Sequence, residues 1–428
     1  MTAPSSLSIP LDIIEIVAEG LSTNRSTFQA LALTCHEYLF ICQRRLFRHV
    51  DLSESGGYLP RRLEALHEAL VHHPEYLGSF IKTLTISLPD YLGYVSYVTR
   101  DPLLPSTLLS FSQLRALHIT YFPLPKFPSE SLIEGEWKEL AQGLVSLLSL
   151  ETLESVVFDS ILELPIDLLG CLAFVKHLCI RHCFFASSSR IPSEFWSQRN
   201  SSSSISRNRL RSLTFEFCDS GTLRKFIEYV TENTSTIAVD GLENLVYNPW
   251  TELSCVLAVE ILETCREELR ELTWPLRPDG LLDNLRVDNL PSLEKFTILV
   301  DLDGDQPGNP LDTLLHLINS INSAQGSLFS PLAIHIRLIN YTLPSPSRFL
   351  QLFDWMSLCD ALSNLSKRRA LRHLSIEFTC SCLWNPNFQT SGMGEDGFPP
   401  RDLCDFMGKM KKEGISTEVP IAKSSKAN

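Results

Sequence analysis

The sequence has 428 residues, of which 44% are hydrophobic and 20% are charged, and its formal net charge is −13. This composition is typical of a folded globular protein and argues against a largely disordered, collagen-like or disulfide-scaffold chain. The excess of acidic residues argues against nucleic-acid binding as the main activity. The length exceeds the roughly 250 to 300 residues that a single hydrophobic core serves, so we expect several domains or an elongated repeat array.

The first 25 residues do not have the pattern of a signal peptide, because Asp12, Glu15 and Glu19 interrupt their apolar stretch. The sequence also has no apolar run of the roughly 18 residues that would span a bilayer. We therefore expect a cytoplasmic or nuclear protein in which the 12 cysteines are reduced thiols.

A first helix is predicted from Ser8-Ile9-Pro10 to Gly20, because proline is favoured in the first turn and acidic residues stabilise a helix N-terminus. Its apolar side chains spread over about 200° of the helical wheel, which is wider than the single stripe of a helix with one buried face. These side chains belong to Ile13, Ile14, Ile16, Val17, Ala18 and Leu21.

A second helix is predicted from the capping-box pattern Ser26-x-x-Gln29, and a further apolar stretch covers Leu39 to Leu52. We expect this helix to continue through Phe28, Leu31, Leu33, Cys35 and Tyr38. A module of this size is too small to be stable alone without disulfides, and its excess of apolar residues predicts a binding partner.

Residues 8–52 resemble the F-box, a helical module that begins with an aliphatic–proline pair, an acidic residue and paired aliphatics. The corresponding residues are Ile9, Pro10, Asp12, Ile13, Ile14, Val17 and Leu21, followed by Leu31, Leu33, Cys35 and Tyr38 in the second helix. Tyr38 stands where the family commonly has tryptophan. The closing run from Leu46 to Leu52 is similar to fungal-type members.

The resemblance implies that this module binds a Skp-type adaptor, which bridges it to a cullin scaffold in a ubiquitin ligase. The implied adaptor contacts are Ile9, Pro10, Ile13, Ile14, Val17, Leu31 and Cys35. The alternative interpretation is a helical hairpin that only caps the rest of the chain.

After a connecting helix predicted within residues 53–74, a phrase recurs that begins with an aliphatic residue and has further aliphatic, or in some copies aromatic, residues at its fourth and sixth positions. In an extended chain the fourth and sixth side chains point to the same face, which predicts a strand. Stretches between the phrases, such as Leu253 to Arg266, have helical spacing. The copies are IKTLTI from Ile81, LRALHI from Leu114, LESVVF from Leu153, VKHLCI from Val175, LRSLTF from Leu210, LENLVY from Leu242, LRELTW from Leu269, LEKFTI from Leu293 and LRHLSI from Leu371.

The phrase resembles the core of the leucine-rich repeat, although the spacing is long and irregular and the usual Asn or Cys after the phrase is mostly missing. One strand and one helix cannot bury an apolar face alone, whereas stacked units can. We therefore predict an α/β fold with a small all-α F-box module followed by an irregular leucine-rich-repeat-like solenoid over 75–385. A further strand is expected at Leu332 to Leu338. The alternative is a mixed α/β domain whose strands share this opening.

Two segments are expected to lie outside the packed units. The serine-rich stretch Ala186 to Arg207 is predicted to be a solvated loop, and residues 386–428 are predicted to be a partly disordered tail.

Two groups of residues have the chemistry of metal ligands, but we expect no metal, cofactor or catalytic site. His177, Cys179, His182 and Cys183 lack a second ligand pair at zinc-finger spacing. An acidic run resembles a calcium loop but lacks its glycine and closing glutamate, and it consists of Asp301, Asp303, Asp305, Asn309 and Asp312. Sequence motifs for nucleophilic catalysis or phosphate binding are absent.

The sequence therefore predicts a non-catalytic substrate-recognition subunit of a Skp–cullin–F-box ubiquitin ligase, or alternatively a scaffold with an F-box-like cap that joins no ligase. A protein substrate is expected to contact the outward side chains of the strands. These are His118, Thr120, Asp159, His177, Arg181, Thr214, Glu216, Asn244, Asn248, Lys295, His373 and Glu377. A set that mixes acids, bases and amides does not specify a ligand. A further alternative is an enzyme that uses the Cys/His cluster of residues 177–183.

Overall fold

The computed structural model describes most of the chain between residues 25 and 380. The described residues are 16, 25–34, 36–53, 59–73, 76–87, 101–120, 142–161, 164–186, 207–232, 235–248, 254–276, 287–301, 310–323, 332–340, 355–369, 371–380, 408, 411 and 416–418. The chain divides into two compact units, Met1–Asn208 and Arg209–Asn428, which are taken in turn. The fold is mixed α/β, with parallel strands in both units.

The N-terminal region contains two helices, α2 (Arg25–Ala32) and α3 (His36–Leu46). The single helix predicted from Ser26 through Tyr38 is wrong, because α2 ends before Leu33. The amides of Leu33 and Thr34 donate to the carbonyls of Ala30 and Leu31, three residues back, which tightens the last turn. The Thr34 hydroxyl also donates to the Leu31 carbonyl at 2.7 Å and competes with continuation of the helix.

A small hydrophobic cluster joins α2 to α3. Phe28, Ile41 and Cys42 are buried in it, and four further side chains are partly buried against it: Leu31, Ala32, Tyr38 and Leu46. The Phe40 ring packs edge-on against Phe80, with ring centroids 5.0 Å apart, and connects α3 to the next part of the unit.

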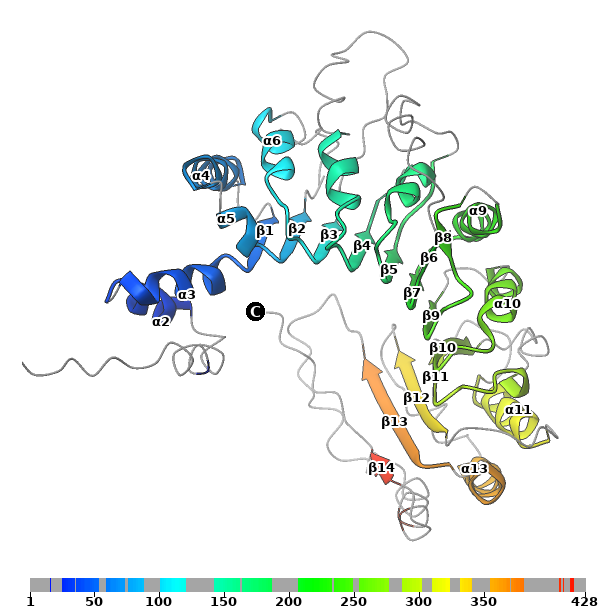
Figure 1. Ribbon diagram of the computed structural model, residues 1–428. Coiled ribbons are helices and arrows are strands. Elements are labelled where there is room, and N and C mark those ends of the chain that lie inside the picture. Colours follow the sequence, from blue (N-terminus) through cyan, green and yellow to red (C-terminus); the bar gives the residue numbers. More distant parts are fainter. Residues whose placement is uncertain are drawn as a thin grey trace, which may run out of the picture. The chain divides into compact units, whose positions relative to one another are not determined.

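The first unit contains five parallel strands that pair in chain order (Figure 1). They are β1 (His49–Ser53), β2 (Thr83–Ser87), β3 (Ala116–Thr120), β4 (Ser155–Asp159) and β5 (His177–Arg181). Helical segments precede most of the strands: α4 (Leu59–His72), α5 (Leu77–Phe80), α6 (Leu103–Leu109) and the 3₁₀ helix η2 (Ile166–Cys171). Residues 8–52 were predicted to form an all-α module, but the last of them form β1 and belong to the sheet.

The second unit contains parallel strands that also follow chain order. They are β7 (Ser212–Glu216), β9 (Asn244–Asn248), β10 (Glu271–Leu276), β11 (Lys295–Asp301), β12 (Ala333–Asn340), β13 (His373–Cys380) and β14 (Ser416–Glu418). A separate two-stranded sheet is formed by β6 (Asn208–Arg209) and β8 (Ile237–Ala238).

Helices of the second unit lie on one side of its strands (Figure 1). They are α9 (Ser220–Thr231), α10 (Ser254–Cys265), α11 (Pro310–Ser323) and α13 (Trp355–Arg369). A short 3₁₀ helix, η4 (Val287–Asn289), precedes β11 in the chain. The start of α9 shows how a strand passes into a helix, because the Asp219 side chain accepts a hydrogen bond from the Thr222 amide at 2.8 Å.

Every copy of the recurring phrase forms a strand that begins at its third residue. The side chains at the first, fourth and sixth positions of all nine copies are at most 4% exposed. Two further copies were not recognised as such: FRHVDL from Phe47 forms β1, which was missed, and PLAIHI from Pro331 leads into β12, the strand that was expected at Leu332 to Leu338. These copies do not match the pattern because their first positions hold phenylalanine and proline, and the pattern begins with an aliphatic residue.

The carbonyl at the second position of a phrase joins each strand to the next one. The Arg48 carbonyl accepts hydrogen bonds from the amides of Lys82 and Thr83, at 2.9 and 3.0 Å. The same pair of bonds recurs at the carbonyls of Lys82, Arg115 and Glu154 in the first unit, and at Arg211, Glu243 and Arg270 in the second. This repeated contact fixes the register of neighbouring strands.

The residue directly after each of three strands has a positive φ, which is uncommon for residues other than glycine. Ser160, His182 and Phe217 have φ values of 57°, 50° and 54°. The next residue returns to the core, and in two cases it is a cysteine: the Cys183 thiol donates to the carbonyls of Phe158 and Arg181, and the Cys218 thiol to that of Glu216. Both cysteines lie three residues after the sixth residue of their phrase.

Several predictions fall outside the described residues. These are most of the serine-rich stretch, residues 302–309 of the acidic run, and most of the segment 386–428. Within that segment β14 pairs in parallel with β13, so at least this part of the predicted tail belongs to the sheet. Over the described part of the chain, no helix combines the length and hydrophobicity needed to cross a membrane.

Gly78 lies where α5 closely approaches the end of α6, so that a Cβ atom on it would collide with the Ser110 carbonyl oxygen. We expect Gly78→Ala to lower the free energy of unfolding by about 1–3 kcal/mol, the usual effect of overpacking. Chemical denaturation measures the change, as a shift of the unfolding midpoint while the slope of the unfolding free energy against denaturant concentration stays the same.

Gly221→Ala is the matched control. A Cβ there would meet only the Asp219 side chain, at 3.4 Å, and alanine is the better helix former within α9. We expect this variant to be as stable as the wild type or more stable. Equal stability of the two alanine variants would contradict the packing of α5 on α6.

Candidate recognition surface

The twelve side chains predicted to contact a substrate all lie at the third, fifth or seventh position of a phrase, and none is buried. The strands show the corresponding alternation, with the intervening residues buried. The structure thus places these residues on the outward face of the strands of their respective units. Their role in binding stays a prediction.

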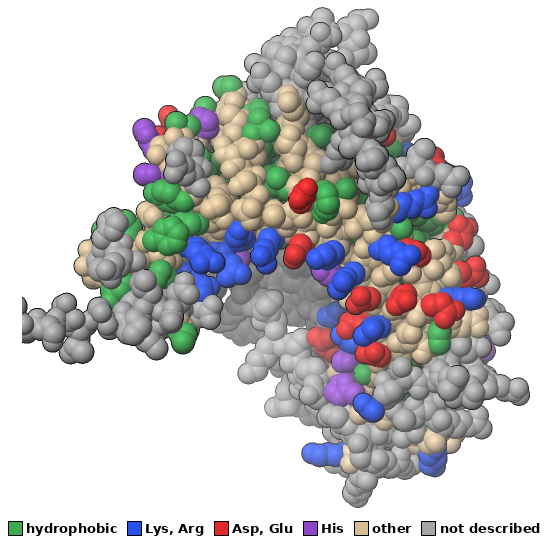
Figure 2. Space-filling model, viewed as in Figure 1, with side chains coloured by type: hydrophobic (Ala, Val, Ile, Leu, Met, Phe, Trp, Pro, Cys, Tyr) green, Lys and Arg blue, Asp and Glu red, His purple; other side chains and the backbone are tan. Residues whose placement is uncertain are grey.

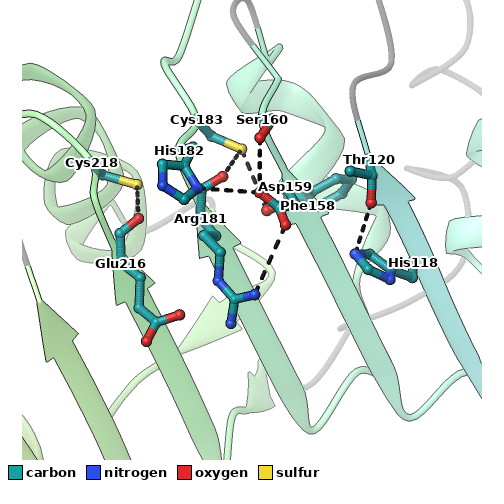
Figure 3. A network of polar contacts seen from close by, with 10 residues as sticks. All are labelled: His118, Thr120, Phe158, Asp159, Ser160, Arg181, His182, Cys183, Glu216 and Cys218. Carbon is teal, nitrogen blue, oxygen red and sulfur yellow. Dashed lines mark hydrogen bonds and ion pairs between the residues drawn. The ribbon is translucent and has the colours of Figure 1, made fainter. Parts of the chain in front are cut away.

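In the first unit the parallel register brings three of these residues into one row. Thr120 lies opposite Asp159, and Asp159 lies opposite Arg181. Figure 3 shows the resulting group of polar side chains at the ends of β3, β4 and β5. Because the strands are parallel, their carboxyl ends meet at one edge of the sheet.

Asp159 is the centre of this group, and its side chain is only 16% exposed. It accepts a hydrogen bond from the Ser160 hydroxyl at 3.0 Å and lies 3.9 Å from the Arg181 guanidinium (Figure 3). His182 Nδ1 lies 3.4 Å from the same Asp159 oxygen that Ser160 contacts. A half-buried carboxylate with several such partners is held in one position.

The group does not have the geometry of a histidine-activated nucleophile. In such a site the serine hydroxyl contacts the histidine, and the histidine contacts the carboxylate. Here the Ser160 hydroxyl donates to Asp159 itself, and His182 contacts that same oxygen. The arrangement instead presents a fixed set of hydrogen-bond donors and acceptors, which suits recognition of another polar surface.

His118 lies two residues before Thr120 on the same outward face of β3, and its Nε2 atom is 2.8 Å from the Thr120 hydroxyl (Figure 3). Burial lowers the pKa of His118 below its usual value. Asp159 and Asp51 act in the opposite direction, and Arg181 acts in the same direction as burial. At neutral pH this residue therefore offers a neutral imidazole to a partner.

The four residues considered as zinc ligands do not converge. His177 is exposed and Cys179 is half-buried, both on the outward face of β5, whereas Cys183 is buried and its thiol donates to two backbone carbonyls. Among the residues that the structure describes, no group of three or more His, Cys, Asp or Glu side chains could hold a metal ion.

In the second unit three predicted residues contact outward side chains that the sequence analysis missed. Lys295 Nζ lies 3.4 Å from Glu271 on the neighbouring strand, and Glu377 accepts a 2.8 Å hydrogen bond from Arg337 Nε. The rings of His373 and His335 lie 5.1 Å apart. Four others, Thr214, Glu216, Asn244 and Asn248, lie at outward positions of β7 and β9.

Glu271 occupies the third position of its phrase, so its outward direction could have been predicted from the sequence. Arg337 and His335 lie on β12, a strand that was expected but whose outward residues were not considered. The pairing of either residue depends on the register between β12 and β13.

Of the residues implied as adaptor contacts, Ile9, Pro10, Ile13, Ile14, Val17 and Cys35 lie outside the described residues. Leu31 is described and is partly buried against the cluster between α2 and α3. Among the described residues of this region, Leu33, directly after α2, is 88% exposed, and Phe40 on α3 is 52% exposed.

Comparison with known proteins assigns no family to the chain. No family model matches the sequence, and no curated protein matches it significantly.

The lowered pKa of His118 predicts a pH dependence of stability. The unfolded chain, with a histidine pKa near 6.5, binds a proton before the folded chain does. His118 therefore favours the folded state above that pH, and this contribution is lost as the pH falls through the folded pKa. We expect the thermal unfolding midpoint of wild type to fall more than that of His118→Gln between about pH 7.5 and 5.

Comparison of the two proteins cancels the contributions of the other titrating groups. An equal fall in the two midpoints, or a larger fall in the variant, would contradict the burial of a neutral His118 side chain.

Proposed function

We propose that the chain is the substrate-recognition subunit of a Skp–cullin–F-box E3 ubiquitin ligase. In this proposal the N-terminal F-box binds the Skp-type adaptor, and a leucine-rich-repeat-like solenoid binds a protein substrate. The observation that carries the proposal is the F-box-like pattern of residues 8–52 directly ahead of the stacked strands.

The described helices support the adaptor side of the proposal through their exposed apolar residues. Leu33 is 88% exposed immediately after α2, and it lies between two implied adaptor contacts, Leu31 and Cys35. Isolated exposed leucines are common, but here the exposed residue lies inside the F-box-like pattern. An adaptor that covers this end of α2 would remove Leu33 from water.

The strands support the substrate side. Each phrase forms a strand, the strands are parallel and in chain order, and two phrases continue into a buried cysteine as leucine-rich repeats do. These features favour a repeat stack over a mixed α/β domain whose strands share their opening by coincidence. The outward rows contain cross-strand pairs such as Arg337 with Glu377, which hold polar groups in fixed positions for a protein partner.

The mechanism is proximity, and this chain performs no bond-breaking step. Binding the adaptor at one region and the substrate at another makes their encounter intramolecular, so the effective concentration of substrate near the ubiquitin-charged enzyme rises. The chain's own contributions are the apolar contacts of the first region and the fixed polar rows of the second.

Substitution of Leu33 tests the adaptor side with little risk to the fold, because this side chain is almost fully exposed. We expect Leu33→Glu to weaken the complex with a co-expressed Skp-type adaptor by about tenfold or more, the usual effect of placing a charge in an apolar contact. Size-exclusion chromatography and titration calorimetry measure complex formation and its affinity.

Val71→Glu is the matched control, because Val71 is 60% exposed on α4, outside the F-box-like segment. It should leave adaptor binding unchanged, and both variants should keep the wild-type unfolding midpoint. A second test replaces two implied contacts together, Pro10→Ala with Ile14→Asp, and should abolish the complex. Failure of the wild-type chain to bind the adaptor would favour the alternative scaffold that joins no ligase.

A further inference from the structure

The second position of the phrase forms a column of charged residues along each set of strands. In the first unit the column reads Arg48, Lys82, Arg115, Glu154 and Lys176. Each of the first four carbonyls accepts two amides from the next strand. Neighbouring side chains of the column are therefore held about 4.8 Å apart along the sheet.

In the corresponding column of the second unit the charges alternate in sign. Arg211 lies 3.9 Å from Glu243, and Arg270 lies 3.9 Å from Glu294. Opposite charges on adjacent strands stabilise their pairing, so these pairs need no further partner.

The first unit differs because its column begins with three consecutive cations. Glu154 pairs with Lys176 at 3.6 Å, and no carboxylate of the described residues forms an ion pair with Arg48, Lys82 or Arg115. We call these three residues the basic column. Figure 2 shows a continuous group of Lys and Arg side chains over this part of the first unit.

The electrostatic environment of Lys82 shows that these charges act on one another. Burial lowers its pKa, and the neighbouring Arg115, Arg44 and Arg48 lower it further. Like charges on directly opposite residues of a sheet are destabilising. A basic column is thus less favourable for folding than the alternating column of the second unit, and an anionic partner would reverse that disadvantage.

The dimensions and surroundings of the basic column restrict the kind of anion. It covers three strands, or about 10 Å, which is the length of about three extended residues. Glu154 ends it on one side, so a long polyanion would meet a carboxylate there. Nucleic-acid sites commonly use six to ten phosphate contacts, which is more than this column provides. A short acidic peptide segment fits better.

We propose that the basic column, Arg48, Lys82 and Arg115, is a binding site for a short run of Asp or Glu residues in a protein partner. The arginine guanidinium groups provide planar donors for carboxylates, and Lys82 adds a point charge between them. The site is separate from the outward rows of the strands and from the implied adaptor contacts, although Arg48 belongs to the closing run of the F-box-like segment. It does not depend on membership of a ligase.

The test measures the affinity of the full chain for a fluorescent peptide containing four consecutive glutamates, with a glutamine peptide as the ligand control. The variant Arg48→Gln, Lys82→Gln, Arg115→Gln removes the basic column. The matched variant Arg61→Gln, Arg62→Gln, Arg224→Gln removes three exposed arginines from α4 and α9 and gives the same net charge.

We expect salt-sensitive binding of the glutamate peptide to wild type, and a rise in Kd of about tenfold in the basic-column variant, the effect of losing three surface ion pairs. The matched variant should bind as the wild type does, and the glutamine peptide should not bind. The basic-column variant should unfold at the wild-type temperature or above it, because like charges have been removed. If the triple variant does not fold, Lys82→Gln alone is measured in its place, and we expect a smaller loss of affinity.

Three results would overturn the proposal. One is the absence of saturable binding of the glutamate peptide to wild type, and another is an equal loss of affinity in the matched variant. The third is tighter binding of a single-stranded oligonucleotide of the same charge, lost in the basic-column variant, which would assign the column to nucleic acid instead.

Discussion

The rest of the structure depends on one repeated contact, in which a carbonyl at the second position of a phrase accepts two amides from the following strand. The contact makes the strands parallel and sets their register to a single value. The same phrase places three apolar side chains in the core, each of which contributes roughly 1.5–3 kcal/mol by its burial. Register and burial are therefore specified together by six residues, and the segments between phrases are free to vary in length.

This arrangement separates the residues that fold the protein from those that can bind a partner. In the nine copies the first, fourth and sixth positions are buried and the second lies along a charged column. Most of the third, fifth and seventh positions face outward, whereas four of them in the second unit are buried: Pro275, Thr297, Leu299 and Ser375. Substitution at the outward positions that are not buried leaves the core residues in place, so these positions can be adapted to a partner. The polar group around Asp159 and the basic column are two such surfaces of the first unit, and both are compatible with a protein that acts by binding.

The strands could be predicted from the sequence because the phrase is a local pattern, and all nine copies form strands. β1 was missed because its phrase begins with Phe47, and the break after α2 was missed because it depends on the bonds of Leu33 and Thr34 with the preceding turn. Outward directions followed from parity, whereas contacts such as Arg337 with Glu377 needed the register across strands. The three cations of the basic column are far apart in the sequence, and only the register of the strands shows that they are neighbours.

Amide hydrogen exchange tests the repeated contact most directly. We expect slow exchange for the pairs of amides that donate to the phrase carbonyls. In the first unit these are Lys82 and Thr83, Arg115 and Ala116, Glu154 and Ser155, and Lys176 and His177. In the second unit they are Glu243 and Asn244, Arg270 and Glu271, and Glu294 and Lys295. Their protection should match that of the amides inside the strands. Exchange of these pairs at the rates of an unstructured peptide, with the strand interiors still protected, would contradict the repeated contact.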